Sequence, residues 1–192
     1  MSEILNKEII IVAGANGVGK TTFARQFLNE YPDYEYLNAD EIAKEISPEN
    51  IQEKQIKAGK IFFEKLKSFV AEEKSFLIES TLSGRYLIKF LSGVQKRNYQ
   101  TTIIFIFVDS PEVAIERIAG RVKKGGHFVP EKDVRRRFER GRRNFWKIYK
   151  NLADRWNLIY NSDNSFEYVV IGKQDQDSIL NDFLFEKFLQ DL

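Results

Sequence analysis

The residues with the clearest chemical potential lie near the N-terminus, where residues 14–21 read Gly-Ala-Asn-Gly-Val-Gly-Lys-Thr. This run fits the pattern G-x-x-x-x-G-K-[ST], in which glycines let backbone N–H groups turn inward around a phosphate. The lysine then reaches the β- and γ-phosphates of a nucleotide, and the final hydroxyl is a ligand for magnesium. We expect Lys20 to be an exposed residue of this loop, outside the core. The pattern predicts a P-loop that binds ATP and Mg²⁺ through Gly14, Asn16, Gly17, Val18, Gly19, Lys20, Thr21 and Thr22.

Two acidic residues follow later apolar runs of the chain. Asp40 comes after a short apolar run, and Glu79 comes directly after the run at 76–78. Because ligands of open α/β sheets bind at the carboxyl ends of the strands, both carboxylates are expected beside the nucleotide. We predict that Asp40 orients or deprotonates an acceptor hydroxyl, the alternative being a helix cap for residues 41–46. Glu79 is expected to hold a magnesium-bound water or a substrate hydroxyl, with Thr81 as a further polar contact, the alternative being a solvated strand-end acid.

Two arginines precede a break in the helical pattern. Arg117 and Arg121 are four residues apart, so both lie on one helical face just before the glycine-rich segment 123–130. Arginines delivered by a closing lid can neutralise the charge of a transferring phosphoryl group. The spacing therefore predicts a small lid at about 121–131 that carries both arginines, the alternative being solvated surface.

Alternating strands and helices must position these residues. The β-branched run at 9–13 predicts a strand buried on both faces, and residues 21–30 are typical of an amphipathic helix. Strands that alternate with helices imply a mostly parallel central sheet flanked by helices, which is the α/β fold of P-loop NTPases. We predict one domain over residues 1–192. Further strands are expected at 34–37, 76–78, 102–108, 156–160 and 168–171, and further helices from Ser47 to about Glu73 and at 85–97, 111–121, 131–153 and 177–189.

Three classes of P-loop protein compete for this sequence. A GTPase-like switch needs Asn-Lys-x-Asp after a strand, and residues 161–163, Asn-Ser-Asp, lack the lysine. Residues 91–95, Leu-Ser-Gly-Val-Gln, resemble the signature of ABC ATPases, but the next apolar strand ends in Asp109 and Ser110 without the required glutamate. A kinase needs a base, magnesium support, positive charge and a lid, and the chain offers candidates for all four. We therefore favour a kinase, with a P-loop ATPase or a nucleotide-binding regulatory protein as the alternative.

Composition argues against several other kinds of site. The chain has no cysteine and one histidine, His127, which disfavours a disulfide framework and zinc sites built from thiolates or histidines. The first residues do not resemble a signal peptide, and no apolar run is long enough to span a bilayer. A cytoplasmic location without a membrane partner is therefore expected. The net charge of +2 does not demand nucleic acid as a partner.

The basic residues concentrate instead between positions 135 and 147, where their phase is that of an amphipathic helix. The apolar side comprises Val134, Phe138, Phe145 and Ile148, and the basic side comprises Arg136, Arg140, Arg143 and Lys147. A helix with a solvated or phosphate-facing side explains this pattern better than nucleic-acid binding does.

A further property of the sequence is the order in which its motifs occur. They are the phosphate loop at 14–22, Asn38-Ala39-Asp40, residues 79–85, Arg117, Arg121, the segment 125–130 with the arginine-rich helix, residues 152–156 and residues 160–162. In order and spacing they resemble the zeta-toxin family of P-loop kinases, in particular its compact branch often labelled predicted ATPase, over nearly the whole chain. The resemblance implies an ATP-dependent kinase with a nucleoside-kinase-like fold. The best-known members of the family phosphorylate a sugar hydroxyl of UDP-N-acetylglucosamine and so poison cell-wall synthesis.

By position, the resemblance also implies a role for individual residues. Lys20 matches the phosphate lysine, and Asp40 matches the carboxylate that activates the substrate. Glu79 matches an active-site acid, and Arg117 or Arg121 matches the first lid arginine.

The chain departs from the family at the second lid arginine. Better-known members place this arginine shortly before a proline, where this chain has Gly126 and His127, so His127 or an arginine of the next helix, such as Arg136, is expected to substitute. The expected acceptor is a small molecule, with UDP-N-acetylglucosamine the first nucleotide sugar to test. An antitoxin protein is the partner that the family suggests. The expected substrate contacts are Asp40, Glu79, Thr81, Arg85 and His127.

Overall fold

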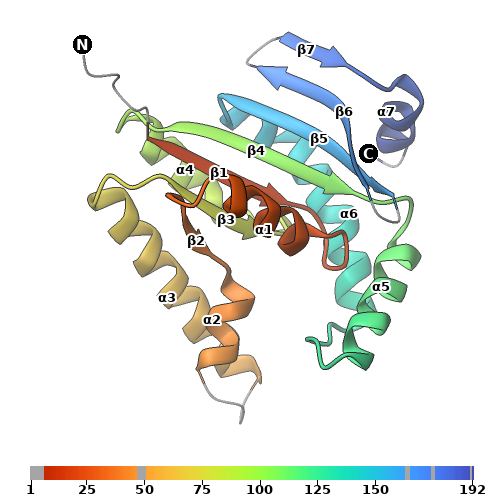
Figure 1. Ribbon diagram of the computed structural model, residues 1–192, viewed down its shortest axis with the longest axis horizontal. Helices are drawn as coiled ribbons and strands as arrows, with labels where there is room; N and C mark the ends of the chain where they lie inside the picture. The colour runs from red at the N-terminus through yellow and green to blue at the C-terminus, as the bar shows by residue number, and fades with distance from the viewer. Residues whose placement is uncertain (1–6, 47–50, 163–164, 174–175, 191) are drawn as a thin grey trace.

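The alternation of strands and helices folds into one seven-stranded sheet with the order β2-β3-β1-β4-β5-β6-β7 (Figure 1). The computed structural model describes residues 7–46, 51–162, 165–173, 176–190 and 192. Strands β1 to β5 pair in parallel and β6 and β7 are added antiparallel, so the predicted mostly parallel α/β sheet is confirmed. The strands are β1 (Glu8–Ala13), β2 (Glu35–Leu37), β3 (Phe76–Ser80), β4 (Gln100–Phe107), β5 (Arg155–Ser162), β6 (Ser165–Lys173) and β7 (Gln176–Ile179).

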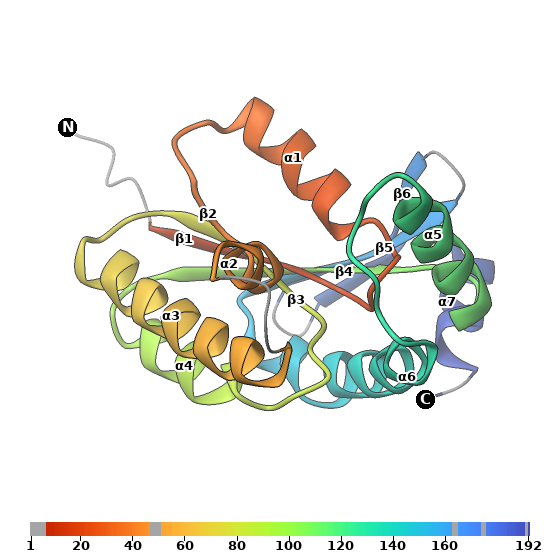
Figure 2. The ribbon, with the colours of Figure 1, turned by 90° about the horizontal axis from the view of Figure 1, so that it is seen from below.

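Helices cover both faces of this sheet (Figure 2). Helices α1 and α5 pack on one face, and α3, α4 and α6 lie across the other. The helices are α1 (Lys20–Glu30), α2 (Ala39–Glu45), α3 (Ile51–Ala71), α4 (Leu87–Gln95), α5 (Pro111–Lys123), α6 (Glu131–Lys147) and α7 (Asp182–Leu189), with a 3₁₀ turn η1 (Tyr149–Leu152) after α6.

Strand β1 shows how an unbroken apolar run suits a central position. The side chains of Ile9 and Ile11 join the core beneath α3 and α4, whereas those of Ile10 and Val12 join the core beneath α1 and α5. Successive side chains of a strand point to opposite faces, so each apolar residue finds a covered side. The prediction of a strand buried on both faces is confirmed.

Helix α6 has the amphipathic character that its sequence predicts. Val134, Phe138 and Phe145 are buried, and the four residues of the predicted basic side are exposed. Arg142 differs from them, because it is buried and its Nε donates a hydrogen bond to the carbonyl oxygen of Phe188 at 2.8 Å. Most of the positive charge of this helix therefore faces solvent.

The C-terminal helix begins later than predicted. Residues Gln176–Ile179 form strand β7, which pairs with β6, where the sequence pattern predicts a helix from position 177. Helix α7 begins after Asn181, whose side chain accepts a hydrogen bond from the backbone N–H of Leu184 at 3.0 Å. This is an N-cap, and it fixes the start of the helix at that residue.

Three other expectations concern helices. The helix predicted over 131–153 ends at Lys147, and η1 continues the chain. The helix start predicted at Ser47 lies outside the described residues. The pentapeptide that resembles the ABC signature lies within α4, where Leu91 and Val94 are buried, so its apolar residues belong to the core.

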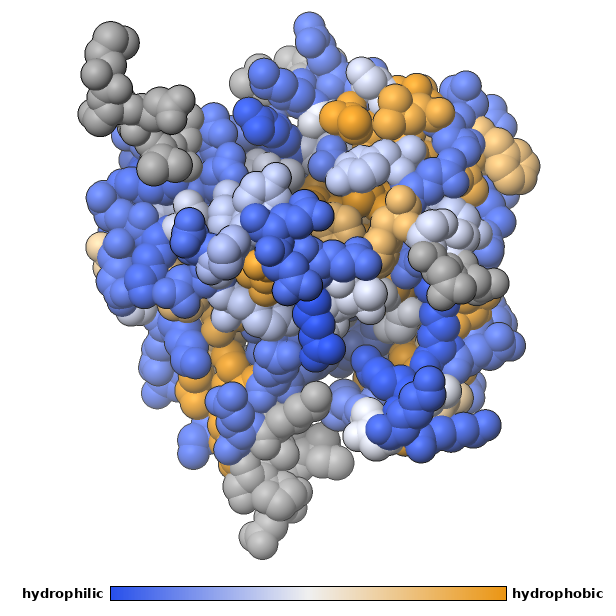
Figure 3. Space-filling model, in the orientation of Figure 1, coloured by the Kyte–Doolittle hydropathy of each residue, from blue (hydrophilic) through white to orange (hydrophobic). Residues whose placement is uncertain are grey.

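Hydrophilic residues dominate the face of the molecule drawn in Figure 3. Apolar side chains gather at its upper right, over β7 and the start of α7, where Ile179, Leu180 and Phe183 are exposed. Within the part of the chain that the structure describes, no helix combines the length and apolarity needed to cross a membrane.

Candidate active site

The phosphate loop connects the end of β1 to the start of α1. Gly14, Gly17 and Gly19 have φ angles of 133°, 87° and 97°, which residues other than glycine rarely adopt. A Cβ on Gly14 would lie 2.2 Å from the carbonyl oxygen of Ile106, and one on Gly17 would lie 2.3 Å from that of Ala114. Both the backbone angles and the lack of space therefore require glycine, and the result is a tight concave loop.

Lys20 begins α1 and is buried, contrary to the expectation of an exposed residue. Its Nζ donates a hydrogen bond to the carbonyl oxygen of Ala15, at 2.9 Å, within the same loop. Burial lowers the pKa of the ammonium, and the negative charges of Glu79 and Asp40 oppose this shift. The lysine is thus held inside the loop, where the charges of two carboxylates favour its charged form.

Glu79 lies at the end of β3 with two hydroxyl groups against it. The Thr21 hydroxyl donates to Oε2 at 3.1 Å, and the Tyr36 hydroxyl donates to Oε1 at 2.5 Å. Burial and the hydrogen bond to Glu79 raise the pKa of Tyr36, so this phenol stays a donor. A threonine hydroxyl beside a carboxylate is an oxygen donor set that fits Mg²⁺, which also takes phosphate oxygens and waters. Sequence reasoning predicted Thr21 and Glu79 but missed Tyr36.

Asp40 lies in the first turn of α2 and is exposed. It lines the same cleft as Glu79. The cap of this helix is Asn38, whose side chain accepts a hydrogen bond from the backbone N–H of Asp40 at 2.8 Å. The alternative role for Asp40, as the cap of a helix at 41–46, is therefore wrong. Its side chain is left available to the cleft that it lines.

A cleft of about 750 Å³ brings most of the predicted site residues together. The predicted residues that line it are Asn16, Gly17, Gly19, Lys20, Thr21, Thr22, Asp40, Glu79, Arg117, Arg121 and His127. The cleft also contains Lys124 of the predicted lid segment. It further contains residues that sequence reasoning did not assign to it, namely Arg25, Gln26, Asn38, Glu41, Ile118, Asn161 and Phe166. The phosphate loop, Asp40, Glu79 and the two arginines predicted for the lid thus line one concave surface.

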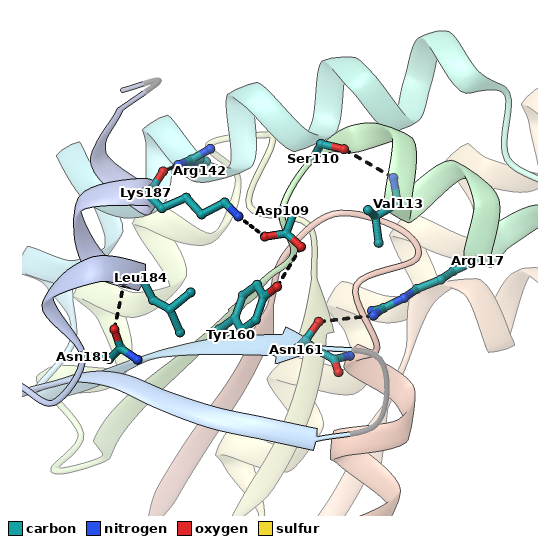
Figure 4. Close-up of polar contacts among 10 residues, drawn as sticks. All are labelled: Asp109, Ser110, Val113, Arg117, Arg142, Tyr160, Asn161, Asn181, Leu184 and Lys187. Atoms are coloured by element: carbon teal, nitrogen blue, oxygen red, sulfur yellow. Dashed lines mark hydrogen bonds and ion pairs between the residues drawn. The ribbon is translucent and has the colours of Figure 1, made fainter.

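Both predicted arginines reach this cleft from α5. Arg117 is half-buried, and its Nη2 donates to the main-chain carbonyl of Asn161 at 3.2 Å (Figure 4). Arg121 is exposed, and its Nη2 donates to the main-chain carbonyl of His127 at 2.8 Å. His127 therefore contacts Arg121 through its backbone.

A third arginine comes from α6, the helix from which the sequence suggested a substitute for the second lid arginine, with Arg136 as the example. The Nη1 of Arg137 donates to Oδ1 of Asn16 in the phosphate loop at 2.8 Å, and its charge is among those that lower the pKa of Lys20. Arg136, the arginine named from the sequence, points away and pairs with Asp133. The available signal was helical phase, since position 137 borders the apolar face whereas position 136 is on the solvated side.

Four predicted residues lie outside the lining of the cleft. Gly14 and Val18 are buried within the loop itself. The Thr81 hydroxyl is hydrogen-bonded to that of Ser83 at 2.9 Å, and Arg85 is exposed ahead of α4. The proposed substrate contacts at Thr81 and Arg85 therefore lie outside the lining of the cleft, in the segment between β3 and α4.

Comparison with known proteins gives both a family and a fold. A family model described as an AAA domain matches residues 9–145. An uncharacterised protein of Haemophilus influenzae is 30% identical over 135 residues, which are 70% of this chain and 95% of that protein.

Solved structures that resemble the chain share its fold at low sequence identity. A chain of the PezAT chromosomal toxin–antitoxin system of Streptococcus pneumoniae has a TM-score of 0.67 at 18% identity, with 98% of this chain and 80% of that chain covered. A chain of the AvrRxo1-ORF1:-ORF2 complex with ATP has a TM-score of 0.73 at 15% identity, and this chain, 97% covered, spans 64% of its length. A putative kinase of Chloroflexus aurantiacus has a TM-score of 0.56 at 16% identity, with 68% and 74% covered. The predicted zeta-toxin-like P-loop kinase fold is confirmed.

Proposed function

The chain belongs to the AAA domain family, and on that basis we propose that it is an ATP- and magnesium-dependent kinase acting on a hydroxyl group of a small molecule. The observation that supports this most is the shared cleft. It combines a phosphate loop with its lysine, a hydroxyl–carboxylate pair suited to magnesium, the exposed carboxylate of Asp40, and arginines. These are the components that phosphoryl transfer requires.

In this proposal the loop and Lys20 bind the β- and γ-phosphates of ATP. Thr21 and Glu79 would hold Mg²⁺, which when bound offsets the negative charge of the phosphates. Arg117 and Arg121 add positive charge around the phosphoryl group in the transition state, where a low-dielectric cleft strengthens the interaction.

Asp40 is proposed as the base. The acceptor oxygen bonds to the γ-phosphorus while the bond from that phosphorus to the β–γ bridging oxygen breaks, and ADP leaves with the electron pair. The proton of the acceptor hydroxyl passes to the Asp40 carboxylate. We propose Arg137, which reaches the phosphate loop, as the replacement for the second lid arginine.

The acceptor and the partner are proposals that rest on the family resemblance. A nucleotide sugar such as UDP-N-acetylglucosamine is the first acceptor to test, with Thr81, Arg85 and His127 as candidate contacts. The likeness to a chain of a toxin–antitoxin system supports an antitoxin protein as a partner. The segment at about 121–131 is proposed as a lid that closes over the phosphates.

The test measures transfer of the γ-phosphate from labelled ATP to a panel of nucleotide sugars and other small alcohols. Lys20→Met keeps the buried volume and removes the charge, so transfer should fall at least 100-fold with an unchanged thermal midpoint. Lys147→Met, on the exposed side of α6, is the matched control and should keep full activity. Normal turnover by Lys20→Met would refute the site. Hydrolysis of ATP without transfer to any acceptor would favour the P-loop ATPase instead.

A further inference from the structure

Asn161, at the end of β5, links two parts of the cleft although it lies outside the residues that the family model matches. Its side-chain Nδ2 donates a hydrogen bond to the main-chain carbonyl of Val18 in the phosphate loop, at 2.8 Å. Its own main-chain carbonyl accepts the hydrogen bond from Arg117 (Figure 4). One half-buried residue thus contacts both the loop and a lid arginine.

The contact between Asn161 and the loop leaves no spare room. A Cβ on Gly19 would lie 2.3 Å from the Asn161 Nδ2, and Gly19 immediately precedes Lys20. The φ angle of 97° at Gly19 is a conformation that glycine adopts readily and other residues do not. The Asn161 amide therefore packs directly against the residue whose backbone turns the chain into α1.

A planar peptide unit makes this hydrogen bond informative about the phosphate site. The carbonyl of Val18 and the N–H of Gly19 belong to the same trans peptide, so they point in opposite directions. Holding the carbonyl toward β5 holds the N–H of Gly19 away from it. A loop fixed in this way loses less conformational freedom when its N–H groups bind an anion.

The end of β5 is itself anchored on both sides. The hydroxyl of Tyr160 donates to Asp109 at 2.7 Å, and Lys187 of α7 pairs with the same carboxylate (Figure 4). Asn161 is also paired with Phe166 of β6, whose ring packs edge-to-face on Phe23 of α1, with centroids 5.2 Å apart. Asn161 is therefore presented to the loop from a fixed position.

We propose that Asn161 is a positioning residue for phosphate binding, which fixes the Val18–Gly19 peptide and seats Arg117 at the same cleft. The inference rests on the proposed nucleotide-binding function and adds a C-terminal element to it. A residue with this role affects every ligand that carries the phosphate chain, whatever else the ligand contains.

The test compares binding of a non-hydrolysable ATP analogue and of inorganic tripolyphosphate by calorimetry. Asn161→Ala should weaken both by the same factor, roughly 3- to 10-fold, as expected for loss of one neutral hydrogen bond. Asn161→Asp keeps the shape but puts an oxygen against the Val18 carbonyl, so its loss should be at least as large. Ser162→Ala is the matched control, because the Ser162 hydroxyl bonds that of Ser165 and should leave both affinities unchanged.

The outcomes separate this proposal from the proposed function. Weakened binding of the ATP analogue with unchanged binding of tripolyphosphate would mean that Asn161 contacts the nucleoside, and would overturn the positioning role. A lower thermal midpoint with both affinities unchanged would leave only a structural role and would overturn it too. Wild-type protein that bound neither ligand would overturn the proposed function as well. Asn161→Asp also provides a shape-preserving variant if Asn161→Ala fails to fold.

Discussion

At the scale of single residues, Asn38 and Asp40, two positions apart, are candidates for two different roles, a helix cap and a catalytic base. The sequence could not say which residue has which role. The Asn38 side chain bonds the first turn of α2, and the Asp40 carboxylate is exposed on the cleft. An N-cap contributes to stability, whereas a base contributes to rate. Substitutions at the two positions should therefore be distinguishable by what they change.

Asp40→Asn should lower phosphoryl transfer by at least 100-fold while the affinity for an ATP analogue stays unchanged, because in the proposed mechanism the carboxylate acts on the acceptor in the transition state. Asn38→Ala should lower the free energy of unfolding by about 1 kcal/mol. Steady-state rates, calorimetric affinities and denaturant unfolding of both variants measure this contrast. If Asp40→Asn kept its rate and lost stability instead, the carboxylate would have no part in catalysis.

At the scale of elements, the turn after α5 wraps closely around Arg121. The N–H of Gly126 donates to the carbonyl oxygen of Arg121 at 3.0 Å. A Cβ on Gly126 would lie 2.4 Å from Cγ and 2.9 Å from the carbonyl oxygen of Arg121. The turn therefore sets the direction of this arginine, and only a residue without a side chain fits there.

Gly126→Ala should displace Arg121 and lower kcat about 10-fold or more, since charge in a transition state depends on placement. Gly120→Ala is the matched control, because a Cβ there meets nothing within 4 Å and alanine favours a helix interior. That variant should keep its kcat and gain up to about 1 kcal/mol of stability. The measurements are kcat and the denaturant unfolding curve of each variant. Equal kcat values for the two variants would assign Arg121 to solvated surface.

At the scale of the whole molecule, α6 and the residues after it hold the loop that follows β3. A Cβ on Gly141 would lie 2.4 Å from the carbonyl oxygen of Thr81, and Asn144 Nδ2 donates to the carbonyl oxygen of Leu82 at 2.8 Å. The hydroxyl of Tyr149 donates to the carbonyl oxygen of Gly84 at 2.8 Å. Helix α6 and the 3₁₀ turn after it thus hold the backbone of residues 81–84 in place.

The Tyr149 contact predicts how stability changes in alkali. Burial raises the pKa of this phenol to about 12, above the ordinary value of 10.0 that it has when unfolded. Its contribution is therefore complete below pH 10 and is lost as the pH rises toward 12, because the unfolded chain releases the proton first. Unfolding free energies between pH 9 and 12 should fall less steeply for Tyr149→Phe than for the wild type. Identical slopes would contradict the buried, neutral phenol.

Local patterns determined much of this protein. The phosphate loop follows from glycines that alone tolerate its angles, the central strand from a continuous apolar run, and the two sides of α6 from helical phase. Asp40 and Glu79 could be expected at one edge because parallel strands end together. All of these depend on residues close in the chain or on the general geometry of a parallel sheet.

Contacts between distant residues were decided only by the tertiary structure. Arg137 meets Asn16 from 121 positions away, and Asn161 meets Val18 from 143 positions away. Neither periodicity nor composition predicts which of several arginines or amides will contact a residue so distant in the sequence. The burial of Lys20 has the same origin, because residues from other strands and helices close around the loop that carries it. A motif within one segment can be recognised in the sequence. Which side chains of different helices and strands meet depends instead on how the layers pack.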